Sequence, residues 1–254
     1  MPYGKLPVVF LSAIASEKEG SVNGSIASYI LEHLDGLKNM GIRELARQCH
    51  VSDSSISRFC REIGLRDYAE LKELFAAPSG SQQYSDRTEA GEILRDYSGQ
   101  VCESIKMVER SINMGKIAEL CRDIRSYQRV AAFGLLKSEG VAMSLQSDLL
   151  MLGKKIDTKL SYRQQLDYMK RVGQDDLIIL FSYTGIYFDY QRPQLPENLK
   201  EAKLYFITGS SDVRPGTFSQ VISFDSRLDN AGNPYAMQFV EGLIVREYER
   251  QARK

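Results

Sequence analysis

The stretch that decides the fold of this chain is Ile42–Ile63, which reads IRELARQCHVSDSSISRFCREI. Apolar residues recur in it at three- and four-residue steps, which is the spacing of amphipathic helices. We expect two short helices that meet near Val51 and Ser52, where Ser52 is a good N-cap for the second helix. The apolar residues expected to form their shared core are Leu45, Cys49, Val51, Ile56 and Phe59. The pattern therefore predicts a helix-turn-helix.

The outer face of the second helix carries short hydroxyl side chains at its start and long cations further along. A helix that inserts its N-terminal end into the major groove of DNA needs such a face. Between Lys38 and Arg66 there are six cations and three acids, a local net charge of +3. The residues predicted to contact DNA are Arg43, Ser52, Ser54, Ser55, Ser57, Arg58 and Arg61. The alternative is an ordinary helical hairpin with solvated arginines.

Length and composition set the frame around this motif. The chain has 254 residues, enough for one large or two modest domains, and 33 cations balance 33 acids, so the basic segment is local. Two histidines and four scattered cysteines without a C-x-x-C pair disfavour a zinc site, and we predict neither a metal nor a cofactor. Scattered thiols fit a reducing cytoplasm. No apolar run approaches the roughly 20 residues that span a bilayer, so no membrane partner is expected.

The helical periodicity runs from Ser25 to Phe75 and is lost over 76–90, where Pro, Gly, Ser and Gln gather. That composition is typical of a linker. We therefore expect a helix-turn-helix DNA-binding domain over 1–77, a linker over 78–90 and a second domain over 91–254. Residues Leu6–Ala15 are interpreted as a short first helix.

The second domain shows short apolar runs typical of buried parallel strands. The runs are Val130–Phe133, Asp176–Phe181, Leu204–Thr208 and Val221–Phe224. Helical patterns lie before, between and after them, including Glu139–Leu152 and Ala236–Arg250. This alternation predicts a multidomain protein, in which an all-α helix-turn-helix domain precedes an α/β domain with a parallel sheet flanked by helices.

Two loops of this α/β domain follow predicted strands at the carboxyl edge of the sheet, where such folds bind ligands. One is Gly134–Gly140 and the other is Ser182–Gly185. Hydroxyl groups, a lysine and backbone N–H groups in such turns suit a phosphate. The predicted effector-binding residues are Gly134, Lys137, Ser138, Ser182, Thr184 and Gly185. The alternative is a pair of ordinary strand-to-helix turns.

Two family resemblances extend this interpretation. The Ile42–Ala46 run, the Val51-Ser52 turn and the Ser55–Arg61 helix resemble the N-terminal domain of RpiR-type transcription regulators, over about residues 24–75. Residues 105–250 resemble more weakly the SIS (sugar isomerase) domain that usually follows it. The resemblance implies a DNA-binding regulator that responds to a phosphorylated sugar and assembles as a homodimer or homotetramer.

The chain departs from these families at several positions. His50 stands where such turns often carry a small residue or glycine. In the SIS patterns Gly-x-Gly-x-Ser and Ser-x-Ser-Gly-x-Thr, Leu136 replaces the second glycine and Tyr187 replaces the last hydroxyl residue. Pro193 and Pro196 are expected to shorten or displace the helix after the second loop.

An enzyme is the runner-up, as a sugar-phosphate isomerase or lyase with an accessory helical domain. Such chemistry needs a positioned base and acid, and the chain has no histidine after His50. Carboxylates such as Glu139, Asp148 and Glu241 are expected to be helix-surface charges. We therefore predict no catalytic residue and no enzymatic activity. A third alternative is that the helical domain docks protein instead of DNA.

Overall fold

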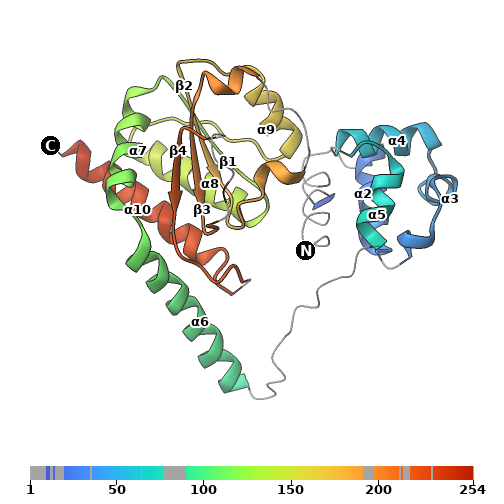
Figure 1. Cartoon of the computed structure of the whole chain (residues 1–254), viewed down its shortest axis with the longest axis horizontal. Helices are drawn as coiled ribbons and strands as arrows, with labels where there is room; N and C mark the ends of the chain where they lie inside the picture. The colour runs from blue at the N-terminus through green and yellow to red at the C-terminus, as the bar shows by residue number, and fades with distance from the viewer. Residues whose placement is uncertain are drawn as a thin grey trace. The chain divides into compact units, whose positions relative to one another are not determined.

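The computed structural model describes residues 10–11, 14, 20–34, 36–63, 65–76, 90–190, 197–211, 213, 218–229 and 231–253. The chain divides into two compact units (Figure 1). The helical unit consists of Met1–Tyr84, Leu160–Leu166 and Phe188–Gln194, and the α/β unit consists of Ser85–Lys159, Asp167–Tyr187 and Leu195–Lys254. The predicted linker, from 78 to 89, lies outside the described residues, as does most of the predicted first helix. The predicted domain boundaries therefore stay a prediction.

The helical unit contains α2 (Val22–Glu32), the 3-10 helix η1 (Leu37–Asn39), α3 (Ile42–Gln48), α4 (Asp53–Glu62) and α5 (Tyr68–Ala76). One apolar cluster holds them together. Its fully buried members include Ile26, Ile30, Leu45, Ile56 and Phe59. Cys49 and Val51 are half-buried and pack against the same cluster, so the shared core predicted for the helix-turn-helix is formed.

The α/β unit begins with two helices, α6 (Ala90–Ser111) and α7 (Met114–Ser126), and then alternates strands with helical segments. Its sheet consists of β1 (Arg129–Gly134), β2 (Asp176–Phe181), β3 (Lys203–Thr208) and β4 (Gln220–Ser223). These strands are all parallel, in the order β1-β2-β3-β4. Its other helical segments are α8 (Lys137–Met151), η3 (Glu197–Lys200) and α10 (Tyr235–Ala252). Helix α9 (Tyr162–Met169) and the 3-10 turn η2 (Tyr187–Tyr190) belong partly to each unit.

Helical segments cover both faces of the sheet, because alternate residues of each strand point to opposite sides. Val130, Ile179 and Tyr205 belong to the main apolar cluster, which they share with α7, α8 and α10. On the other face Phe133 packs edge-on against Tyr168 of α9, with ring centroids 5.3 Å apart. The fold class predicted from the sequence is thus confirmed.

A short edge pairing extends the sheet beyond β1 and determines where its loops open. Asp157 donates its N–H to Val130 O at 2.8 Å and accepts from Ala132 N–H at 2.9 Å, in a parallel bridge. After β1 the chain pairs at the edge of the sheet beside β1, through Asp157. After β2 it continues toward the opposite edge, through β3 and β4. The β1–β2 border is therefore the switch point at which open α/β sheets bind ligands.

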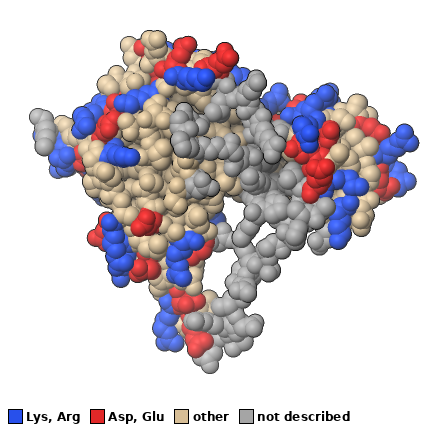
Figure 2. Space-filling view, in the orientation of Figure 1, with Lys and Arg blue, Asp and Glu red and all other residues tan. Residues whose placement is uncertain are grey.

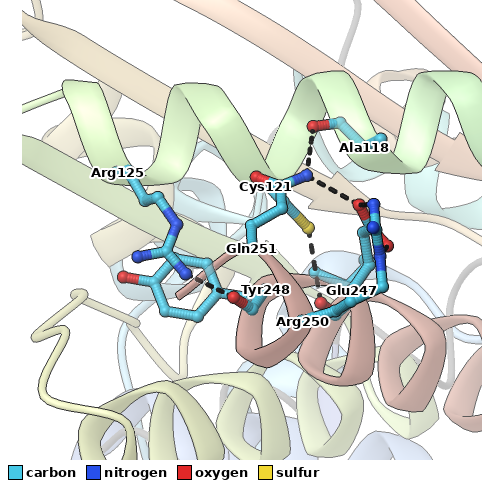
Figure 3. Close-up of polar contacts among 8 residues, drawn as sticks. Ala118, Cys121, Arg125, Glu247, Tyr248, Arg250 and Gln251 are labelled. Carbon is cyan, nitrogen blue, oxygen red and sulfur yellow. Dashed lines mark hydrogen bonds and ion pairs between the residues drawn. The ribbon is translucent and has the colours of Figure 1, made fainter. Parts of the chain in front are cut away.

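The C-terminal half of α10 is held on α7 by several polar contacts (Figure 3). The Arg125 guanidinium lies 3.9 Å from the centroid of the Tyr248 ring and also donates to Tyr248 O. Gln251 donates to Ala118 O at 3.0 Å and to the buried Glu247 carboxylate at 2.7 Å. These contacts fix the C-terminal end of α10.

One helix of the structure, α9, was not predicted from the sequence. Between β2 and β3 the described residues form only the 3-10 turns η2 and η3. Pro193 and Pro196 lie outside the described residues, so the effect expected of them stays a prediction. Among the described helices, none is long and apolar enough to cross a membrane.

Candidate DNA-recognition helix and effector loops

The turn between α3 and α4 ends α3 with a hydrogen-bonding pattern that requires a left-handed residue. Val51 N–H donates to Ala46 O at 2.9 Å, and His50 N–H donates to Arg47 O at 3.1 Å. Together these two bonds form a Schellman motif. His50 takes the left-handed position, with φ of 54°. The turn therefore keeps the conformation that glycine favours, although the residue is histidine.

Helix α4 begins with a cluster of hydroxyl groups. Ser52 is its N-cap, and its Oγ accepts from Ser55 N–H at 3.2 Å. The same oxygen lies 2.8 Å from Ser54 Oγ and 2.9 Å from Ser55 Oγ. Ser57 donates back to Asp53 O at 3.1 Å. Ser52 and Ser54 are exposed, whereas Ser55 and Ser57 are half-buried and so face outward only in part.

The cations on the outer face differ in how strongly they are held. Arg58 and Arg61 are exposed, and within the described part of the chain neither forms an ion pair. Arg43 lies 3.8 Å from the Asp53 carboxylate, and its own side chain is 93% exposed, so this ion pair is weak. Arg47 instead binds both oxygens of Glu44 at 2.7 Å and thereby lowers the pKa of that carboxyl.

On the viewed face of each unit, the described residues form no large patch of a single charge (Figure 2). Cations and acids are interspersed over the viewed face of each unit (Figure 2), in keeping with the formal net charge of zero. Attraction to a polyanion therefore depends on local groups that are free to pair, and Arg58 and Arg61 are such groups.

The β1 loop brings the start of α8 very close to the sheet. A Cβ added at Gly134 would lie 2.4 Å from Ser138 O, so only glycine fits there. Leu136 has φ of 53° and ψ of −114°, a backbone conformation that glycine favours. Ser138 is buried in the first turn of α8, and Lys137 is exposed and donates to Asn233 O at 2.7 Å.

The β2 loop lies beside the β1 loop, because Gly134 and Phe181 are partners in the strand register. Ser182 is buried, Thr184 is exposed, and Gly185 has φ of 80° with its N–H bonded to Ser182 O at 3.0 Å. The side-chain hydroxyls of Ser182 and Thr184 have no hydrogen bond to any described residue. Two adjacent loops thus present hydroxyl groups and one ammonium at the switch point.

The three acids that were weighed as catalytic candidates differ in how deeply they are buried. Glu139, next to the β1 loop, is half-buried, and burial raises its pKa. Glu241 of α10 is only 2% exposed, so the expectation of a helix-surface charge is wrong for this residue. Burial, and then the charge of Asp148, raise the pKa of Glu241 to about 7. Asp148 itself is exposed, as expected.

These features define a helix-turn-helix unit of the DNA-binding class joined to an α/β unit with two ligand-type loops. Residues 11–79 match the family described as the helix-turn-helix domain of the rpiR family. The chain therefore carries an rpiR-family helix-turn-helix domain, which confirms the resemblance given by the sequence.

The chain is also similar to a curated relative and to solved structures. An uncharacterized HTH-type transcriptional regulator of Providencia stuartii is 27% identical over 193 residues, or 69% of this chain and 67% of the relative. The alignments with the next three relatives cover between 17% and 64% of their lengths. These names agree with a regulator and not with the isomerase alternative.

Two solved structures share the fold at low sequence identity. The Vibrio vulnificus NanR protein complexed with ManNAc-6P is 17% identical with a TM-score of 0.52, and the match covers 98% of this chain and 93% of that one. The c3406 protein of E. coli CFT073, solved as a ligand complex, is 17% identical with a TM-score of 0.51, covering 63% and 90%. The chain thus shares the fold of these two proteins over the stretches that the matches cover.

Proposed function

We propose that this protein is a transcription regulator that binds double-stranded DNA through α4. The observation that carries the proposal is the exposed outer face of α4, where hydroxyl groups at the helix start precede two cations without a described partner. A recognition helix contacts base edges with its N-terminal residues and phosphates with nearby cations. The match to the rpiR-family helix-turn-helix domain supports the same function.

The contacts divide by chemistry. Ser54 and Ser55 are short enough for base edges, and Arg58 is long enough to reach guanine or a phosphate from the next turn. Ser52 and Ser57 hold the start of the helix through their bonds to Ser55 N–H and Asp53 O. Arg43 and Arg61 are proposed to bind phosphates, which sets the register of the protein on the duplex.

The α/β unit is proposed to bind a phosphorylated sugar at the β1–β2 switch point. The free hydroxyls of Ser182 and Thr184 and the ammonium of Lys137 are donors suited to a phosphate dianion. Gly134, Ser138 and Gly185 shape the two loops around it. NanR shares the fold and was solved in complex with ManNAc-6P, which supports this ligand class.

The whole protein is proposed to act in the cytoplasm as a homodimer or homotetramer, with a helix-turn-helix domain over 1–77, a linker over 78–90 and an effector domain over 91–254. A dimer presents two α4 helices to half-sites about 34 Å apart. A bound effector shifts DNA affinity only by binding the two arrangements of the dimer unequally.

Selection of duplexes from a random DNA pool with the full chain tests the DNA-binding function. The expected result is enrichment of an inverted repeat whose half-sites are about 10 bp, or a multiple of that, apart. A pool that stays random through repeated rounds at low salt would contradict the function.

Thermal unfolding of the full chain with a panel of hexose, pentose and amino-sugar phosphates, including ManNAc-6P, tests the effector site. A ligand at 100 times its Kd stabilises the protein by about 2.7 kcal/mol. The shift should be lost in Ser182→Ala and Thr184→Ala and kept in Ser98→Ala, a matched hydroxyl on α6. An equal shift in all three variants would contradict the assigned site.

A further inference from the structure

Residues 231–235 comprise the segment that leads into α10 and the first residue of that helix, and they connect the two proposed effector loops with α6; we call them the junction segment. Its first link is to the β1 loop, where the Lys137 ammonium donates to Asn233 O at 2.7 Å. Lys137 and Asn233 are 96 residues apart in the chain. A neutral carbonyl is a weaker acceptor than a phosphate oxygen. A phosphate bound at the β2 loop would therefore compete for Lys137.

A second link joins the junction segment to the β2 loop and to α6 at once. A Cβ added at Gly232 would lie 2.5 Å from Ser104 Oγ of α6 and 3.1 Å from Tyr183 Oη of the β2 loop. Gly232 and Tyr183 are buried, and so is Ser104. The segment is thus packed between the β2 loop and α6 with no spare room, so a shift of one side displaces the other.

The third link reaches the exposed part of α6. Tyr97 donates its hydroxyl to the Tyr235 hydroxyl at 3.0 Å, and the two rings meet edge to face with centroids 6.3 Å apart. Tyr235 is the first residue of α10. In the chain, α6 is the first described helix after the helix-turn-helix unit, so a change in α6 is the most direct route to that unit.

The rest of α10 gives the junction segment a fixed support. The contacts of Arg125 and Gln251 hold the C-terminal turns of α10 on α7 (Figure 3). Tyr235 lies at the opposite end of the same helix. Displacement of the junction segment should therefore alter its contacts with α6 and should not move the whole of α10.

From these contacts we propose that the junction segment is the relay that transmits effector binding to α6. In the structure Lys137 binds Asn233 O, and Tyr97 binds Tyr235. A bound phosphate draws Lys137 away, and the freed junction segment loosens its contacts with Ser104 and Tyr97. This inference rests on the proposed function and adds the regulatory connection within the same site.

Hydrogen exchange of α6 amides in the full chain tests the relay without effector or DNA. Lys137→Met removes the bond to Asn233 and should speed exchange over residues 93–101 about fivefold. Lys155→Met, a matched exposed lysine, should leave this exchange unchanged. Tyr97→Ala should give a similar rise, and the Lys137→Met/Tyr97→Ala pair should add little more, because both changes break one path. No rise in Lys137→Met, or fully additive rises, would overturn the relay.

DNA titration with and without ManNAc-6P separates the relay from the proposed function. The effector should change the Kd for DNA of the unaltered chain about fivefold or more. In Tyr97→Ala that change should fall below about twofold, whereas Leu94→Ala, an exposed apolar residue on the same helix, should respond like the unaltered chain. An undiminished response in Tyr97→Ala overturns the relay alone. Failure of the unaltered chain to bind DNA contradicts the proposed function, and the exchange result still decides the relay.

Discussion

His50 and Leu136 adopt backbone conformations with positive φ, which glycine adopts more easily. Each lies at a turn that positions a proposed contact, His50 before α4 and Leu136 before α8. The left-handed conformation of His50 costs an L-residue about 1–2 kcal/mol. The positive φ of Leu136 is likewise one that glycine adopts more easily.

Substitution at His50 should reveal this backbone requirement. His50→Gly should keep or slightly raise the free energy of unfolding of the helical unit, because glycine accepts φ of 54° without strain. His50→Val should lower it by about 1–2 kcal/mol, since a β-branched residue is a genuine outlier there. Urea unfolding followed by circular dichroism measures both. Equal stability of the two variants would show that the turn does not need this conformation.

Glu241 gives a prediction on pH. Its pKa in the folded protein is about 7, above the ordinary 4.5, because burial and Asp148 disfavour the carboxylate, while Gln238 donates to it at 2.7 Å. Between these values the folded state holds more protons than the unfolded one, so stability falls as pH rises from about 4.5 to 7. Relative to Glu241→Gln, the protein should lose at most about 3 kcal/mol over that window.

Denaturant unfolding at pH 5 and pH 8 measures this difference. Glu109→Gln, an exposed acid on α6, serves as the control and should follow the pH dependence of the unaltered chain. A Glu241→Gln variant with that same dependence would contradict the buried, proton-binding role of Glu241.

At the scale of elements, local signals in the sequence predicted most of what the structure contains. The 3.6-residue period and the Ser52 cap gave α4, and the short apolar runs gave all four strands. Helix α9 was missed because its eight residues are fewer than the 11–18 that a periodicity argument needs, although Tyr162, Leu166 and Met169 recur at helical spacing. The edge pairing at Asp157 was missed because a single bridge leaves no strand-length pattern.

The cap of α4 has a measurable weight. Ser52→Ala removes the acceptor for Ser55 N–H and should cost the helical unit about 1 kcal/mol of unfolding free energy. Ser54→Ala, at an exposed position whose hydroxyl bonds to Ser52 alone among the described residues, should cost less than about 0.5 kcal/mol. Thermal or urea unfolding distinguishes the two, and equal losses would contradict the assigned cap.

At the scale of the whole molecule, the sites depend on contacts between residues far apart in sequence. The two effector loops could be predicted because each follows a strand end, and parallel strands end at one edge. The Lys137–Asn233 bond, the fit of Gly232 beside α6 and the burial of Glu241 could not, because they arise only when α10 packs against α6 and the loops. The proposed regulatory path therefore depends on tertiary contacts that the sequence pattern does not show.

The proposed relay can regulate transcription only if α4 contacts DNA. Titration of a selected duplex with the full chain is therefore the most direct test of DNA binding through α4. At fixed salt, Arg58→Ala should weaken binding at least about tenfold, since a lost base or phosphate contact costs about 1–3 kcal/mol. Lys106→Ala, an exposed cation on α6, should bind like the unaltered chain. We expect the two variants to differ in this way. An Arg58→Ala protein that binds the duplex with unchanged Kd would contradict the role of α4 in DNA binding.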